Sequence, residues 1–234
     1  NGGYAASYLA IGQILPDDSL EVAVVHRMPT TPFTPRLSII DAVSGIIEAT
    51  LDLPGTVSYG SAPVLADLNS DGLDDVIVLT AGRLSAISGG NLQQLPGFPF
   101  YLGDVRISDS APIVGDIGGP NGSEIVLITE VPGVFARSEV HIINQAGIYM
   151  MPRFSMDISP RTGAIHDLDN DGHNELIIAA RGAATIAVQD SIWVFDFSRN
   201  EPTPTTHGAV LWGQFGQNSE RCNCSIIALK SIKY

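Results

Sequence analysis

Two nine-residue segments, Asp67–Asp75 and Asp167–Glu175, constrain the fold of this chain more than any other feature. Each carries oxygen-bearing side chains at positions 1, 3, 5 and 9 and a glycine at position 6. A hard cation requires this arrangement, because Ca²⁺ takes about six to eight oxygen ligands at ~2.3–2.6 Å and the chain must turn sharply to bring them together. Glycine supplies a backbone conformation that other residues adopt only at a cost. The sequence therefore predicts two calcium loops.

The two loops belong to a repeat, and two degraded copies lie in register with them. Position 1 of the degraded copies is Gln13 in one and Asp116 in the other. All four copies have an acidic residue at position 9 and a short apolar run on each side of the loop; the position 9 acids are Glu21, Asp75, Glu124 and Glu175. A β-rich repeat of about 50 residues is typical of propellers and related arrays. The approximate units are 4–60, 61–109, 110–158 and 159–216, with 217–234 as a tail or closing strand.

Each unit contains four short runs that are rich in Val and Ile and bounded by turn residues, which is typical of buried strands rather than helices. Helical periodicity is absent. The last strands of the second, third and fourth units are expected at Leu95–Phe100, Ile148–Met151 and near 209–215. Short strands at regular spacing predict an all-β fold, a β-propeller of four-stranded blades.

Composition excludes some partners. The formal net charge is −13, with only 12 Lys and Arg, so nucleic acid is not an expected partner, because phosphate binding needs a basic patch. No segment approaches the roughly 20 apolar residues of a membrane span, so membrane insertion is not expected. The chain begins Asn1-Gly-Gly without a signal peptide, and we expect it to be a trimmed or excerpted sequence.

The two cysteines, Cys222 and Cys224, are separated by one residue. A bridge between them would close a strained ring, and two thiols are too few ligands for zinc. We therefore expect free thiols or pairing with another chain, and the second case would support self-association.

No catalytic motif stands out, and we expect the chain not to be an enzyme. There is no nucleophile elbow and no glycine-rich phosphate loop. The histidines show no metal-ligand spacing and are expected to be ordinary strand or loop residues; they are His26, His141, His166, His173 and His207.

The loop pattern Asp-Leu-(Asn/Asp)-x-Asp-Gly-x-x-(Asp/Glu), followed by an apolar strand, resembles the FG-GAP/VCBS repeat. This repeat occurs in the propellers of integrin α-chains and in many bacterial surface and secreted proteins. Leu95-Pro-Gly-Phe-Pro99 and the segment Trp212–Arg221 resemble elements of the bacterial members. The resemblance implies a blade whose calcium lies between its first two strands, at one face of a disc. It also leaves the blade number open: a small closed propeller, a fragment, or further copies too degraded to detect.

The resemblance assigns ligands residue by residue. The first site would be Asp67, Asn69, Asp71 and Asp75 with the backbone carbonyl of Leu73, and the second would be Asp167, Asp169, Asp171 and Glu175 with the carbonyl of His173. Two loops depart from the pattern. Gly118 and Pro120 replace ligands in one, and Gln13 and Leu15 replace them in the other, so we expect both to be metal-free. The acid that persists at position 9 suggests that it also hydrogen-bonds the backbone of the turn.

The functional expectation is a calcium-stabilised propeller, secreted or at the cell surface, that serves as a binding or structural module for a protein or glycan partner, for example in cell adhesion. Two alternatives stay open. One is a self-assembling surface or filament protein; the other is a lectin, or a non-catalytic propeller part of a polysaccharide-active enzyme.

Overall fold

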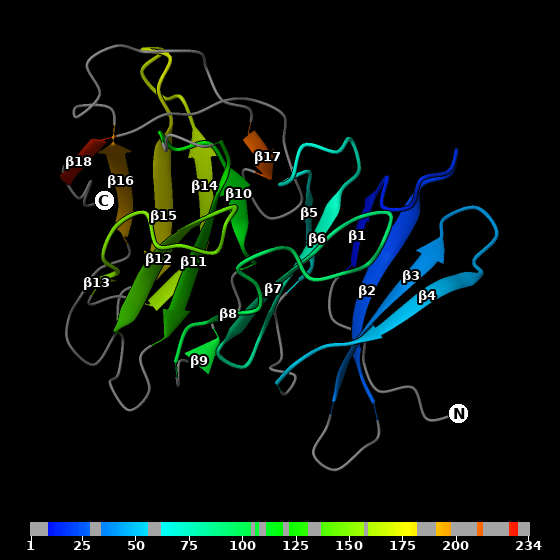
Figure 1. The fold of residues 1–234 in the computed structure, drawn as a ribbon. Helices are drawn as coiled ribbons and strands as arrows, with labels where there is room; N and C mark the ends of the chain where they lie inside the picture. The colour runs from blue at the N-terminus through cyan, green and yellow to red at the C-terminus, as the bar shows by residue number, and fades with distance from the viewer. Residues whose placement is uncertain are drawn as a thin grey trace. The chain divides into compact units, whose positions relative to one another are not determined.

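A computed structural model describes residues 9–28, 34–55, 62–103, 106–107, 111–118, 122–130, 137–156, 159–181, 191–197, 210–212 and 225–228. Every regular element in these ranges is a β-strand, and the strands form antiparallel sheets (Figure 1). The chain divides into two compact units, Asn1–Pro112 and Ile113–Tyr234. The all-β fold predicted from the sequence is thus confirmed. The described residues include no helix long and apolar enough to cross a membrane.

The first unit contains two four-stranded sheets. Their strands follow the order of the chain, so each sheet is a meander of adjacent antiparallel strands. The first sheet consists of β1 (Leu9–Gly12), β2 (Glu21–Arg27), β3 (Pro35–Asp41) and β4 (Ile47–Asp52). The second consists of β5 (Val64–Ala66), β6 (Asp75–Thr80), β7 (Arg83–Ile87) and β8 (Phe100–Tyr101), and a two-residue strand, β9 (Arg106–Ile107), follows it in the chain.

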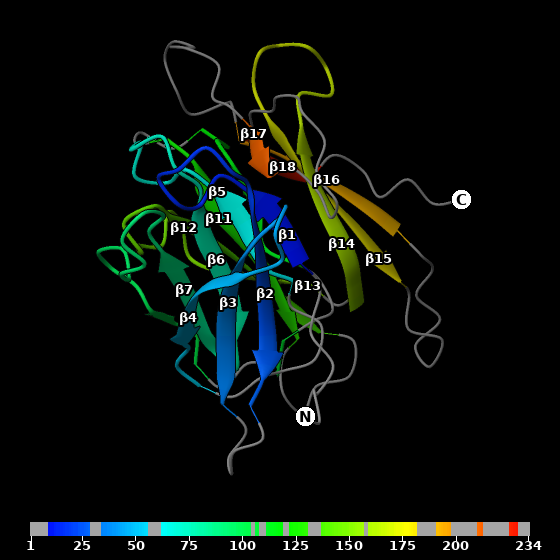
Figure 2. The ribbon, with the colours of Figure 1, turned by 90° about the vertical axis from the view of Figure 1, so that its right-hand side faces the viewer.

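The second unit contains the third and fourth sheets. The third has the strand order β13-β12-β11-β10-β17, and the fourth has the order β14-β15-β16-β18. Figure 2 shows β14 and β15 side by side. The strands that the second unit contributes to the third sheet are β10 (Ile113–Gly115), β11 (Glu124–Glu130), β12 (Ser138–Asn144), β13 (Phe154–Met156) and β17 (Val210–Trp212). Those of the fourth are β14 (Ser159–His166), β15 (Glu175–Arg181), β16 (Ser191–Phe197) and β18 (Ser225–Ala228).

The inner strands β6 and β11 are buried on both faces, which explains their continuous apolar runs. Every residue of β6 is buried, and so are the first six residues of β11. By contrast, no residue of the outermost strand β4 is buried. In the second unit one apolar core is shared by the third and fourth sheets and includes Val126, Ile142 and Leu176. The ring of Trp193 stacks on that of Phe195 at 6.5 Å between centroids, so these aromatic side chains pack within the protein.

The outermost strands of the last three sheets differ from the sequence prediction. In the second sheet the last strand is β8, and the expected segment Leu95–Phe100 is largely irregular, because Pro96 and Pro99 have no backbone N–H to give to a ladder. In the third sheet only the isolated bridge between Ile143 and Tyr149 forms in the expected segment, and the strand is β13.

The fourth sheet differs most. The strand β17 lies where the last strand of this unit was expected, but it pairs with β10 of the third sheet. The fourth strand of the fourth sheet is instead β18, in the segment expected as a tail or closing strand. Cys222, Cys224 and the segment 213–221 lie outside the described residues.

Candidate metal centres

All four repeat loops occupy the same place in their sheets. Each loop connects the first strand of a sheet to the second, and its position 9 acid is the first residue of the second strand, at the start of β2, β6, β11 and β15. The alignment of the four repeats deduced from the sequence therefore places each loop at the same position in its sheet.

The position 9 carboxylate holds the turn in every copy. Its side chain is buried in all four, with an exposed fraction of at most 4%. One carboxylate oxygen accepts the backbone N–H of position 2, as expected from the sequence. The four pairs are Ile14 to Glu21 at 2.7 Å, Leu68 to Asp75 at 2.8 Å, Ile117 to Glu124 at 2.9 Å and Leu168 to Glu175 at 2.6 Å. The bond is present in loops with and without a full set of candidate ligands.

The two loops with complete ligand sets share one backbone conformation. Position 4 has a positive φ in both, 60° at Ser70 and 58° at Asn170, and so does the glycine at position 6, 90° at Gly72 and 87° at Gly172. In each loop the position 1 carboxylate accepts the N–H of that glycine, at 2.9 Å for Asp67 and 3.1 Å for Asp167.

The position 5 carboxylate closes a second small turn in each of these loops. Asp71 accepts the N–H of Leu73 at 2.9 Å, and Asp171 accepts that of His173 at 2.8 Å. Two segments about 100 residues apart in the chain therefore adopt the same loop conformation, with the same carboxylate-to-backbone hydrogen bonds.

The fourth loop brings three of its four predicted carboxylate ligands together, and Asp171 is not part of that group. Carboxylate oxygens of Asp167, Asp169 and Glu175 lie within 4.8 Å of one another. Oδ1 of Asp167 is buried and has no hydrogen-bond partner, although a buried oxygen of this kind costs free energy unless something pairs with it. Burial, together with Asp169, Asp196 and Asp171, raises the pKa of Glu175 to about 7. An oxygen-only donor set with an orphaned buried oxygen fits Ca²⁺.

The second loop is closed more tightly on its own backbone and side chains. Asn69 donates from Nδ2 to Asp71 at 2.9 Å. The second oxygen of Asp75 accepts the N–H of Gly89 at 3.0 Å, and burial raises the pKa of this carboxyl to about 6. The close acidic group of the fourth loop is formed by positions 1, 3 and 9. Position 3 of the second loop is the amide Asn69, so the second loop has no equivalent group of three carboxylates.

Sequence reasoning missed the role of position 8. The carboxylate of Asp74 accepts the backbone N–H of Gln13 at 3.0 Å, and the N–H of Asp74 donates to the carbonyl of Gln13 at 2.7 Å. In the second unit Asn174 donates from Nδ2 to the carbonyl of Asp116. Position 8 of each ligand-rich loop thus contacts position 1 of the preceding, degraded loop. The sequence feature that could have indicated this contact is the polar residue at position 8, which is not a ligand position of the loop.

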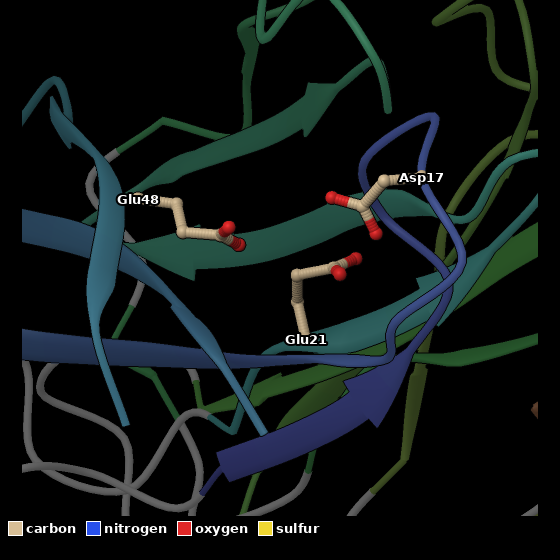
Figure 3. A group of neighbouring side chains, drawn as sticks. All are labelled: Asp17, Glu21 and Glu48. Atoms are coloured by element: carbon tan, nitrogen blue, oxygen red, sulfur yellow. The ribbon is translucent and has the colours of Figure 1, made fainter. Parts of the chain in front are cut away.

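A second acidic group was also missed. Carboxylate oxygens of Asp17, Glu21 and Glu48 lie within 4.8 Å of one another. Asp17 and Glu21 belong to the first loop, which was expected to be metal-free, and Glu48 lies on β4 (Figure 3). No local sequence pattern could include Glu48, because strand pairing alone brings it to the loop.

The most deeply buried histidine has a structural environment. His141 is fully buried; Nε2 lies 2.9 Å from the hydroxyl of Thr129 and Nδ1 lies 2.8 Å from that of Tyr149. Burial, followed by the positive charge of Arg153, lowers the pKa of His141 to about 4. The ring is therefore neutral at physiological pH and joins β11 to β12.

No family model and no curated protein matches the sequence. Among solved structures, the crystal structure of the V. cholerae biofilm matrix protein Bap1 is similar to this chain, with a TM-score of 0.45 and 16% sequence identity. The similarity covers 82% of this chain and 38% of the Bap1 chain. The chain therefore spans less than half of that protein.

Proposed function

We propose that the four sheets are blades of a calcium-stabilised β-propeller of the FG-GAP/VCBS type, which works outside the cell as a non-catalytic binding or structural module. Support comes from the meander order of the first two sheets and from the place of every loop between the first and second strands of a sheet. These are the features that the resemblance implies for a blade.

One observation carries the calcium proposal. Asp167, Asp169 and Glu175 bring carboxylate oxygens within 4.8 Å of one another. Like charges this close disfavour the ionised state. A divalent cation would remove that repulsion and pair with the orphaned oxygen of Asp167.

Calcium would act by holding together the two strands that flank the loop. In the fourth sheet β14 and β15 pair antiparallel from the loop outward, starting at His166 and Glu175. An ion bound across the loop would hold this hairpin closed, so part of the binding free energy would appear as folding free energy. Weak calcium modules with dissociation constants of about 10⁻⁴–10⁻³ M are an extracellular class, which supports a secreted or cell-surface setting.

The partner that we propose is a protein or a glycan, with nucleic acid disfavoured by the net charge of −13. Sheets whose inner strands are fully buried form a rigid frame, and binding residues in such proteins are commonly carried by the connecting loops. A screen of immobilised glycans and extracellular proteins, run in calcium and in chelator, tests this part.

The test of the calcium proposal is a thermal melt in millimolar calcium and in chelator. Free ligand at about 100 times its dissociation constant stabilises the native state by about 2.7 kcal/mol per site, so the midpoint should rise by several degrees. Asp171→Ala should reduce the rise, whereas Asp116→Ala, in a loop without a full ligand set, should leave it intact. Equal midpoints in the two buffers would refute the proposal.

A further inference from the structure

The first sheet carries a group of three carboxylates; two of them occupy positions 5 and 9 of the first loop, and the loop pattern does not include the third, Glu48. Asp17 lies in the loop between β1 and β2, Glu21 is the first residue of β2, and Glu48 lies on β4. Their side chains point toward one another (Figure 3), and their carboxylate oxygens lie within 4.8 Å of one another. Three acids from three elements thus meet at one place.

Glu21 provides an observation that is independent of this clustering. Its side chain is fully buried. Oε2 accepts the N–H of Ile14 at 2.7 Å and that of Leu15 at 2.8 Å. The other oxygen, Oε1, is buried without a hydrogen-bond partner. A buried, unpaired oxygen on a carboxylate that faces two further carboxylates calls for a positive partner, because leaving it unpaired carries its full desolvation cost.

Protein cations do not fill that role among the described residues, where no Arg or His forms an ion pair with Asp17, Glu21 or Glu48. Asp41 also lies near enough to act on Glu48 electrostatically, and its charge has the same sign. The described charges that act on this group are therefore negative.

A local irregularity of the sheet brings Glu48 to the group. In the pairing of β3 with β4, Ile40 lies opposite Ile47 and Ile39 lies opposite Ala49, so Glu48 is an extra residue on β4. A β-bulge of this kind re-aims the side chain of the extra residue, and bulges are enriched beside functional sites.

The interior of the first loop is closed by a protein group. Nε2 of Gln13 donates to the carbonyl oxygens of Leu15 at 2.7 Å and Asp17 at 2.8 Å. Gln13 is the position 1 residue, so its amide nitrogen stabilises the turn at the position where the other three loops have an aspartate. The first loop therefore contributes carboxylates only from positions 5 and 9, Asp17 and Glu21, and the third carboxylate of the group comes from Glu48 on β4.

We propose that Asp17, Glu21 and Glu48 bind a third divalent cation, of the calcium class, which clamps the outermost strand β4 to the first loop. The donors are all oxygen atoms. Two of the three side chains are exposed, which leaves room for water ligands. Ca²⁺ accepts irregular sets of carboxylates and waters, whereas Mg²⁺ demands near-octahedral geometry. This site is independent of the two loop sites proposed above, and it replaces the expectation that the first loop is metal-free.

Equilibrium dialysis against radioactive calcium at millimolar concentration tests the site by stoichiometry. The wild-type protein should bind one more equivalent than Glu48→Gln. The double variant Asp71→Ala/Asp171→Ala, which lacks position 5 ligands in both ligand-rich loops, should retain that one equivalent. Adding Glu48→Gln to the double variant should abolish binding.

Asp18→Asn is the matched control, because Asp18 is an exposed acid of the same loop outside the group. It removes the same charge and should leave the stoichiometry unchanged. Glu48 is exposed, so its substitution should leave the fold intact, and the wild-type background gives a result even if the double variant does not fold. Equal calcium binding by the wild type and Glu48→Gln would overturn the inference, and the two loop sites would be unaffected by that outcome.

Discussion

The carboxylate of Asp74 accepts the backbone N–H of Gln13, which lies 61 residues earlier in the chain, at 3.0 Å. The N–H of Asp74 donates back to the carbonyl of Gln13 at 2.7 Å. The two residues therefore form a reciprocal pair that joins the first loop to the second. Because Asp74 directly precedes the position 9 acid Asp75, the pair fixes the end of one loop against the beginning of another.

Asp74→Ala should destabilise the first unit by about 1–3 kcal/mol, because the N–H of Gln13 would lose its acceptor. The loss should be similar in calcium and in chelator, since the contact does not involve a metal. Asp74→Asn should lose less, because its side-chain oxygen can still accept the bond. Urea denaturation in both buffers measures the difference. A penalty confined to calcium buffer would mean that Asp74 acts mainly through the ion.

Substitutions of the loop ligands should act mainly when calcium is present. Asp67→Ala and Asp171→Ala should each lose most of the stabilisation from one ion, about 2.7 kcal/mol when free calcium is about 100 times the dissociation constant. In chelator both should lose much less, because the exposed N–H groups of Gly72 and His173 can turn to water and each substitution removes a repelling charge. Differential scanning calorimetry over a calcium titration measures this, with Asp116→Ala as the control. A calcium response abolished by Asp116→Ala would contradict the division into full and degraded loops.

The position 9 acid of the third loop tests whether this carboxylate stabilises the turn in a loop that lacks a full set of metal ligands. Glu124 is fully buried and accepts the N–H of Ile117 at 2.9 Å. Glu124→Ala should cost about 1–3 kcal/mol in free energy of unfolding, equally in calcium and in chelator. Glu124→Gln should recover part of the loss, since its carbonyl oxygen can accept the same bond. If the denaturation curves of both variants coincided with that of the wild type, Glu124 would not stabilise the turn.

His141 should make the stability depend on pH. Its pKa is about 4 in the folded protein and about 6.5 when unperturbed. Between these values the unfolded chain binds a proton that the folded chain does not. The neutral ring therefore contributes its full stability above pH ~6.5, and this is lost as pH falls toward 4, by at most about 1.4 kcal/mol per unit.

The contribution of His141 is isolated by comparison with His141→Gln, which can keep a hydrogen bond to Thr129 or Tyr149. Calorimetry at saturating calcium should show that the stability difference between the wild type and the variant narrows as pH falls from 7 to 4.5. A difference that is constant across this range would mean that His141 is protonated in the folded state as readily as in the unfolded chain.

The sequence predicts the regular part of the fold well because one physical pattern repeats. A loop with an acid at position 9, followed by a buried apolar run, places the first two strands of every sheet, for example β5 and β6 around Asp75. The outermost strands are predicted less well. They are short and bear prolines nearby, as at Pro99 before β8, so local propensity does not decide where they pair.

The loop pattern does not predict contacts between segments that are distant in the chain. The contact of Asn174 with Asp116 and the approach of Glu48 to Glu21 both depend on strand pairing and on a bulge. The pairing of β17 with β10 of the third sheet likewise joins segments that are distant in the chain. The loop pattern can name candidate ligands such as Asp167, but it cannot show which other segments of the chain meet them.

The bond from the position 9 acid to the N–H of position 2 is formed in all four loops, and it has a consequence for how such a chain can change. Since the turn is built by the protein itself, a copy can lose its ligands, as at Gly118, and still connect its strands. The number of ions that the chain carries is then uncoupled from the number of its sheets. Dependence on the surrounding calcium can be raised or lowered one loop at a time, while the architecture stays constant.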